Sequence, residues 1–187
     1  MITHYTYGGI FNMKKIKGTV AALLIASMAL SIAACGSVKE VEPKEFKTAV
    51  KEILDCDKDD IAESDGYDYI ESIIKYKGED YDKYDIELTE YDDEEAAQYI
   101  FDSRVMTMNF LKDHDGIEGK SKIAKNYITY DAEITPYYDG DSEDAYGGVY
   151  LAKNYIIEIS TSTGKDKDKD VIDDLLKEIG YPRPSRA

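Results

Sequence analysis

GVYLAKNYIIEIST, residues 148–161, is the segment from which the fold of this chain is most readily predicted. It contains two runs of β-branched and aromatic residues, Gly148–Ala152 and Tyr155–Thr161, with only Lys153 and Asn154 between them. Two such runs around a two-residue turn predict a β-hairpin, in which asparagine tolerates a positive φ. Because the strands of a hairpin are antiparallel, we expect the chain to build an antiparallel sheet.

Three further segments predict strands of the same sheet. Residues 69–76 and 84–90 flank the turn-prone sequence KGED and form a second predicted hairpin. In residues 126–135 apolar and polar side chains alternate, which predicts a strand with one buried and one wet face. The acidic, glycine-containing residues 137–147 are expected to form a loop between strands.

Three segments have the apolar spacing of amphipathic helices. They are residues 43–55, 93–112 and 169–179, and Gly180 is expected to end the last of them. The order is therefore α-β-β-α-β-β-β-α. Hairpins, rather than strands that alternate with helices, predict an α+β fold with an antiparallel sheet of about five strands and three helices on one face.

The N-terminal residues follow a different pattern. Residues 13–17, MKKIK, are cationic, and residues 18–34 are uncharged and rich in Ala, Leu and Ile. That order is typical of a secretory signal, and the apolar run is short for a spanning helix of about 20 residues. Its end, IAAC at residues 32–35, resembles the lipobox of bacterial lipoproteins. An ordinary secretory signal or an uncleaved anchor is the competing interpretation.

The resemblance to the lipobox implies that Cys35 is diacylglycerylated and that the chain is cleaved between Ala34 and Cys35. The sequence then divides into a start extension at 1–12, a signal peptide at 13–34, the lipidated cysteine and a tether at 35–42, a single α+β domain at 43–181 and a tail at 182–187. The extension fits no signal-peptide pattern, so we expect a misassigned start and translation from Met13.

The predicted mature domain is similar to the small, uncharacterised lipoproteins of Gram-positive bacteria. The similarity rests on a helix-first α+β layout that ends near residues 179–181, and it brings no known activity. The lipobox implies a lipid-anchored protein on the extracytoplasmic face of the cell membrane. The acidity, the scarcity of cysteine and the short tether favour a Gram-positive over a Gram-negative cell.

The charge of the chain restricts its partners. It has 23 basic and 39 acidic residues, a net charge of −16. Removal of the leader, which carries three lysines and no acidic residue, would make this −19. Such a surface repels nucleic acid and anionic lipid headgroups, so no nucleic-acid partner is expected and the lipid must hold the protein at the membrane. A protein or peptide partner attracted by charge should be basic.

Catalytic chemistry has little support in the sequence. With Cys35 lipidated, Cys56 would have no disulfide partner, and the aspartates around it would raise the pKa of its thiol. His114 is the single histidine after the leader, and it lies in a polar segment. We therefore predict a noncatalytic binding or envelope-associated module and not an enzyme. A hydrolase that uses clustered carboxylates is the weaker alternative.

One acidic stretch is a candidate calcium site. It has acidic residues at the first, third, fifth and ninth positions of a calcium loop, namely Asp55, Asp57, Asp59 and Glu63. Asp60, however, stands where such a loop needs glycine. A calcium-dependent binding module and a solvated acidic turn are thus both compatible with this stretch, and Ca²⁺ is the one cofactor that the sequence points to.

Two tyrosines are the candidate ligand-binding residues. Tyr137 and Tyr138 lie beside an acidic loop. Tyrosine is favoured at interfaces, because it offers a large ring and a hydroxyl group. We expect these two side chains to be exposed binding residues.

Overall fold

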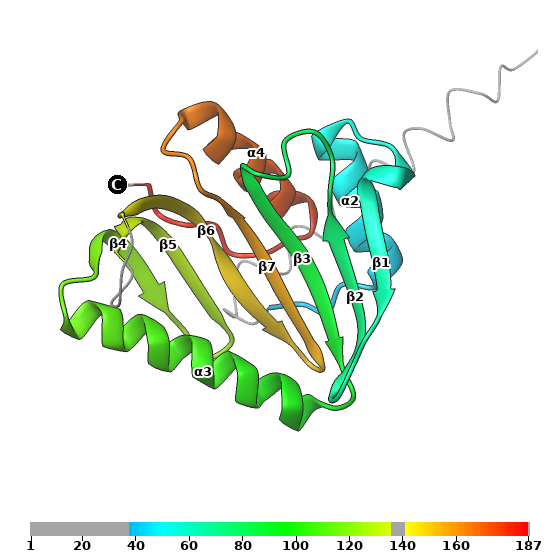
Figure 1. The fold of residues 1–187 in the computed structure, drawn as a ribbon, viewed down its shortest axis with the longest axis horizontal. Coiled ribbons are helices and arrows are strands. Elements are labelled where there is room, and N and C mark those ends of the chain that lie inside the picture. The colour runs from blue at the N-terminus through cyan, green and yellow to red at the C-terminus, as the bar shows by residue number, and fades with distance from the viewer. Residues whose placement is uncertain (1–37, 136–140, 187) are drawn as a thin grey trace, which may run out of the picture. The chain divides into compact units, whose positions relative to one another are not determined.

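A seven-stranded antiparallel sheet is the centre of this computed structural model, which describes residues 38–135 and 141–186 (Figure 1). The strand order is β1-β2-β3-β7-β6-β5-β4. The strands are β1 (Ile61–Asp65), β2 (Ile70–Tyr76), β3 (Tyr84–Tyr91), β4 (Ile117–Ile123), β5 (Tyr127–Ile134), β6 (Glu143–Ala152) and β7 (Tyr155–Thr161). The antiparallel sheet was expected, but the expectation of about five strands was wrong.

The two additional strands, β1 and β4, form the two edges of the sheet. Each is paired on one side only, β1 with β2 and β4 with β5. In β1 only Ile61 is buried, and no residue of β4 is fully buried. Backbone hydrogen bonds to one neighbour hold an edge strand, so its sequence needs little apolar alternation. The periodicity that predicts inner strands is therefore weak in these two segments.

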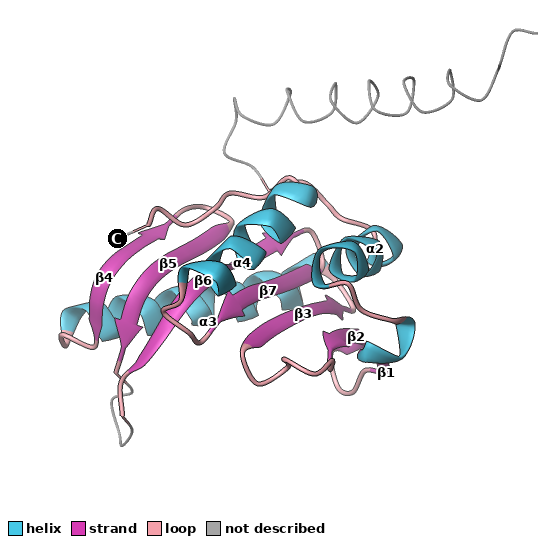
Figure 2. Ribbon diagram, turned by 90° about the horizontal axis from the view of Figure 1, so that it is seen from above, coloured by secondary structure: helices cyan, strands magenta, loops and turns pink. Residues whose placement is uncertain are grey.

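Three helices cover the sheet on both faces. They are α2 (Pro43–Leu54), α3 (Glu94–Asp113) and α4 (Asp166–Glu178), and a short 3₁₀ turn, η1 (Lys58–Asp60), precedes β1. Helices α2 and α4 lie on one face and α3 on the other (Figure 2). The expectation that all helices share one face was wrong. The reason lies in the inner strands, which are apolar on both sides.

Strand β7 illustrates this two-sided burial. Ile157 and Ile159 belong to the apolar core beneath α2 and α4, whereas Ile156 belongs to the core beneath α3. All three are at most 2% exposed. In β5, likewise, Thr129 and Asp131 are buried, although alternation had predicted a wet face on their side.

The β6–β7 turn and the ends of the helices are stabilised by local hydrogen bonds and backbone conformations. In the hairpin between β6 and β7, Lys153 and not Asn154 has the positive φ, 56°, and the Asn154 side chain donates to the Tyr91 carbonyl at 3.0 Å. Asp93 caps α3 by accepting from the Ala96 amide at 2.8 Å. Gly180, with φ 76°, follows the end of α4, as its sequence predicted.

Candidate functional site

Several residues that the sequence singled out lie outside the described part of the chain. They are Ala34, Cys35, Tyr137 and Tyr138. The cleavage site, the lipid attachment and the tyrosine pair therefore stay predictions.

The four acidic residues of the candidate calcium site lie on three different elements. Asp55 ends α2 in a left-handed conformation, with φ 48°. The Asp57 amide donates to the Asp60 carboxylate at 2.8 Å across the 3₁₀ turn. Glu63, on β1, accepts from Lys47 at 2.9 and 3.0 Å. Among the residues that the structure describes, no three His, Cys, Asp or Glu side chains are placed to hold a metal ion. Calcium binding stays a prediction.

Helix α3 is attached to its sheet face by an apolar stripe and an ion pair. Ala97, Phe101 and Met108 are buried against the sheet, as the helical periodicity predicted. Arg104 donates from Nη2 to Oε1 of Glu158, on β7, at 2.8 Å. The buried stripe therefore accounts for the position of the helix.

A second apolar stripe, which was not predicted from the sequence, runs along the opposite side of α3. Tyr99, Met106 and Phe110 are 74%, 71% and 39% exposed. Each residue advances a helix by about 100°, so the three side chains lie within about 40° of one another and opposite the buried stripe. We call them the outer stripe. Their spacing of seven and four residues is the signal that could have identified them.

Acidic residues border the outer stripe. By the same helical geometry, Glu95, Asp102 and Asp113 lie within about 60° of its centre. Arg104 and Lys112, the only basic residues of α3, lie about 140° away from it, toward the sheet. The solvent side of this helix is therefore apolar and acidic.

The turn between β1 and β2 adds exposed aromatic side chains beside the start of α3. Tyr67 and Tyr69 are both exposed. The Tyr69 ring stacks on Tyr91 with centroids 6.0 Å apart, and its carbonyl accepts from the Asp92 amide at 3.1 Å. Since Asp92 directly precedes the cap of α3, these tyrosines lie near the N-terminal end of the outer stripe.

His114 follows the last turn of α3 and packs on the outer stripe. Its ring stacks on Phe110 with centroids 4.1 Å apart, and its Nδ1 lies 2.8 Å from the Phe110 carbonyl oxygen. These contacts agree with the prediction of a polar helix end.

A polar row crosses the sheet on the α3 side. Lys75, on β2, donates to Asp85 at 2.8 Å and to Glu87 at 3.0 Å, both on β3. Burial acts to lower the pKa of Lys75, but these two hydrogen bonds outweigh it and raise the pKa. Burial raises the pKa of Glu158, although Arg104 acts against it. The row therefore pairs its two cations, Lys75 and Arg104, with carboxylates.

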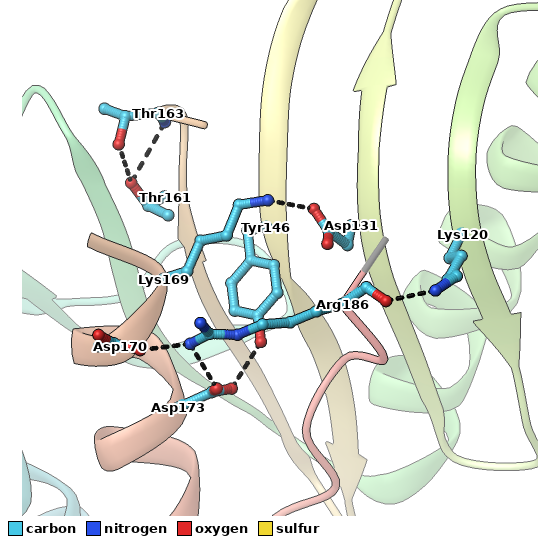
Figure 3. A network of polar contacts seen from close by, with 9 residues as sticks. All are labelled: Lys120, Asp131, Tyr146, Thr161, Thr163, Lys169, Asp170, Asp173 and Arg186. Atoms are coloured by element: carbon cyan, nitrogen blue, oxygen red, sulfur yellow. Dashed lines mark hydrogen bonds and ion pairs between the residues drawn. The ribbon is translucent and has the colours of Figure 1, made fainter. Parts of the chain in front are cut away.

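The C-terminal segment is fixed to α4 and the sheet by the polar network of Figure 3. Arg186 donates to Asp170 at 2.5 Å and to Asp173 at 2.9 Å, both on α4. Tyr146, on β6, donates to the same Asp173 at 2.6 Å. The guanidinium of Arg186 lies 5.8 Å and the ammonium of Lys169 5.2 Å from the centroid of the Tyr146 ring.

This network reaches the far edge of the sheet. Lys169 donates to the buried Asp131 of β5 at 2.5 Å, and Lys120 of β4 donates to the Arg186 carbonyl. Burial, aided by the hydrogen bond to Asp173, raises the pKa of Tyr146 to about 12. The residues expected to be a tail thus pack on the sheet, and the network has a structural role.

Comparison with known proteins adds no relative. The chain matches no known protein-family model, no curated protein and no solved structure. Within residues 38–135 and 141–186, no helix is long and apolar enough to cross a membrane.

Proposed function

We propose that this protein is a lipid-anchored, noncatalytic binding module on the extracytoplasmic face of the cell membrane, and that it binds a basic protein through the outer stripe of α3. The observation that carries the proposal is the second apolar stripe on a helix whose first stripe already attaches it to the sheet. Nothing in the packing of the domain requires Tyr99 or Met106 to be apolar, since both are more than 70% exposed.

The side chains of the outer stripe suit a protein contact. Aromatic residues and methionine are enriched in the cores of protein interfaces, and buried aromatic anchors contribute most of the binding energy. Methionine in addition adapts its shape to a partner. Tyr67 and Tyr69 extend the apolar surface beyond the end of the helix.

The negative charge around the outer stripe favours a basic partner. Glu95, Asp102 and Asp113 border the stripe, and the whole chain carries a net charge of −16. A basic partner is attracted by this field and associates faster. A second copy of the chain would bring equal acidic surfaces together, and an anionic membrane surface would be repelled as well. We therefore commit to a basic protein.

The lipid anchor is tested by labelling with palmitate. Cells that produce the full chain should incorporate label and retain the protein in the membrane fraction. The variant Cys35→Ala should lose the label. An unlabelled full chain, or a Cys35→Ala variant that still incorporates label, would contradict the anchor.

The binding surface is tested by photo-crosslinking in the cells that make the protein. A benzophenone amino acid at Met106 should give an adduct with a basic protein, whereas the same group at the exposed Thr48 of α2 should not. The identified partner, once purified, should bind the variant Met106→Glu about tenfold more weakly, because a charge then replaces an apolar contact.

Three results would overturn this surface. They are an adduct with a second copy of the chain, an adduct with lipid, and no adduct at Met106. The variant Thr48→Glu, which adds the same charge elsewhere, is the matched control and should bind the partner as the unchanged chain does.

A further inference from the structure

The outer stripe of α3 is straight and has gaps between its large side chains. Tyr99, Met106 and Phe110 lie within about 40° of one another, so the stripe runs nearly parallel to the helix axis, for about 16 Å. Ser103 follows Tyr99 by one helical turn, Thr107 follows Ser103 by another, and both are exposed. Along the helix, the stripe therefore alternates large side chains with small ones.

These side chains form two holes of the kind through which helices pack on one another. Residues at i, i+3, i+4 and i+7 surround a hole that accepts one side chain of a facing helix. One hole is formed by Tyr99, Asp102, Ser103 and Met106, and the next by Ser103, Met106, Thr107 and Phe110, all of them exposed. The Thr107 hydroxyl donates to the Ser103 carbonyl at 3.0 Å, so a partner that covers it does not leave this donor unpaired.

The backbone of α3 restricts what the partner can present. Peptide groups inside a helix are hydrogen-bonded within it, so α3 offers a partner side chains and no backbone donor or acceptor. A strand or a loop pressed on this surface would lose water from its own N–H and C=O groups without replacing it, whereas a helix pairs these groups internally. Among the elements that the structure describes, no other helix or strand lies over this side of α3 (Figure 1).

The charged border of the outer stripe lies on one side only. Glu95, Asp102 and Asp113 are all displaced in the same direction around the helix, by about 40–60° from the centre of the stripe, and they form an acidic row about 27 Å long. The opposite border has the uncharged Ser103 and Thr107. A helix that packs here therefore needs basic residues along one side of its own apolar stripe, where ion pairs between packed helices form.

We propose that the basic partner contacts the outer stripe with an amphipathic α-helix that packs along α3. Two apolar side chains of this helix occupy the holes beside Ser103 and Thr107. Its lysines or arginines lie against Glu95, Asp102 and Asp113. This inference rests on the proposed function and specifies the structural element that the partner presents.

The experiment compares two synthetic peptides of identical composition, each of about 18 residues, which is the length of a helix that spans the acidic row. Both have leucine at heptad positions a and d and are kept helical by α-aminoisobutyric acid. The flanked peptide has its lysines at e and g, beside the leucines, and the reversed peptide has them at b and c, away from the leucines.

Binding is followed by amide chemical shifts of the ¹⁵N-labelled full chain. The flanked peptide should shift the amides of Ser103, Met106 and Thr107. The reversed peptide should bind about tenfold more weakly, because its lysines do not reach the three acids of the row.

A variant with a filled hole separates helix packing from general apolar adhesion. Ser103→Phe adds apolar surface but occupies the space for a partner side chain, so it should weaken binding of the flanked peptide about tenfold. Thr48→Phe, on the exposed face of α2, adds the same ring elsewhere and is the matched control. Both changes are at the surface, so the spectrum of each variant also reports that it is folded.

Three results of these titrations would overturn the helical partner. They are equal binding of the two peptides, unchanged or stronger binding by Ser103→Phe, and no shift at Ser103, Met106 and Thr107 with the flanked peptide at millimolar concentration. Crosslinking at Met106 to a basic protein through a segment that is not helical would overturn it too, but would leave the outer stripe as the binding surface. The two proposals can therefore fail separately.

Discussion

Glu87 and Glu158 lie directly opposite each other on the adjacent central strands β3 and β7. Two like charges in this position destabilise a sheet. Each carboxylate has its own cation, since Lys75 donates to Glu87 and Arg104 donates to Glu158. Arg104 therefore does more than attach α3, because it also makes the acidic pair tolerable at neutral pH.

The variant Arg104→Met should destabilise the fold in a pH-dependent way. A carboxyl group whose pKa is raised by folding stabilises the fold at pH values below its ordinary pKa. This stabilisation is lost as the pH rises through the pKa of the folded state. Glu158 is such a group, and Arg104 lowers its pKa. We expect Arg104→Met to lower the free energy of unfolding by about 1 kcal/mol at pH 7 and by less at pH 4. Urea denaturation at both pH values measures this, and equal losses would contradict it. Arg104→Lys keeps the charge and is the control.

Gly147→Ala should be strongly destabilising. Gly147 has φ 151°, and a Cβ there would lie 2.1 Å from the Ile159 carbonyl oxygen of β7. We expect a loss of at least about 2 kcal/mol in the free energy of unfolding, from the clash and the backbone strain together. Gly164→Ala is the matched control, because its Cβ would meet only the movable carboxylate of Asp144. Similar losses in the two variants would refute this explanation.

The thiol of Cys56 should react slowly. Burial, followed by the charge of Asp60, raises its pKa above the ordinary value. In a Cys35→Ser background, alkylation by iodoacetamide should be slow at pH 7 and accelerate with rising pH, since the thiolate is the reacting species. Asp60→Asn should speed the reaction, whereas Asp65→Asn should not. A rate equal to that of the urea-unfolded chain would show that the thiol is not protected.

Arg186→Gln should loosen the C-terminal segment without unfolding the domain. The change removes the contacts to Asp170, Asp173 and the Tyr146 ring. Because Arg186 is largely exposed, we expect the melting temperature to fall by only about 1–3 °C. Hydrogen exchange should become faster in β6 around Tyr146 and unchanged in β2. An exchange pattern that changes equally throughout the sheet would indicate a global effect instead.

The elements that the sequence predicted are those with either a continuous apolar run, as in the strands of a hairpin, or a single buried apolar stripe, as in a helix. The hairpin of β6 and β7 and the buried stripe Ala97, Phe101 and Met108 follow from the sequence in this way. The edge strands β1 and β4 could not be predicted from that pattern, because backbone pairing rather than side-chain burial holds them. The buried Asp131 was expected to face water, since a sequence does not reveal that Lys169, 38 residues later, pairs with it.

Only part of the candidate binding surface could be predicted from the sequence. The acidic character, which favours a basic partner, follows directly from the composition. Tyr99 and Met106 belong to a helix with apolar residues on two sides, and periodicity alone does not say which side meets the sheet.

The pairing of β3 with β7 also sets the order in which the domain is able to fold. Glu90 and Tyr155 are register partners in the middle of the sheet, yet 65 residues separate them in the chain. During synthesis the edge of β3 that pairs with β7 has no partner until residues 155–161 have been made. Sheets that depend on such distant pairings fold slowly and leave aggregation-prone edges until they close. A chain cut before β7 should therefore be a target for chaperones or proteases and not a stable half-domain.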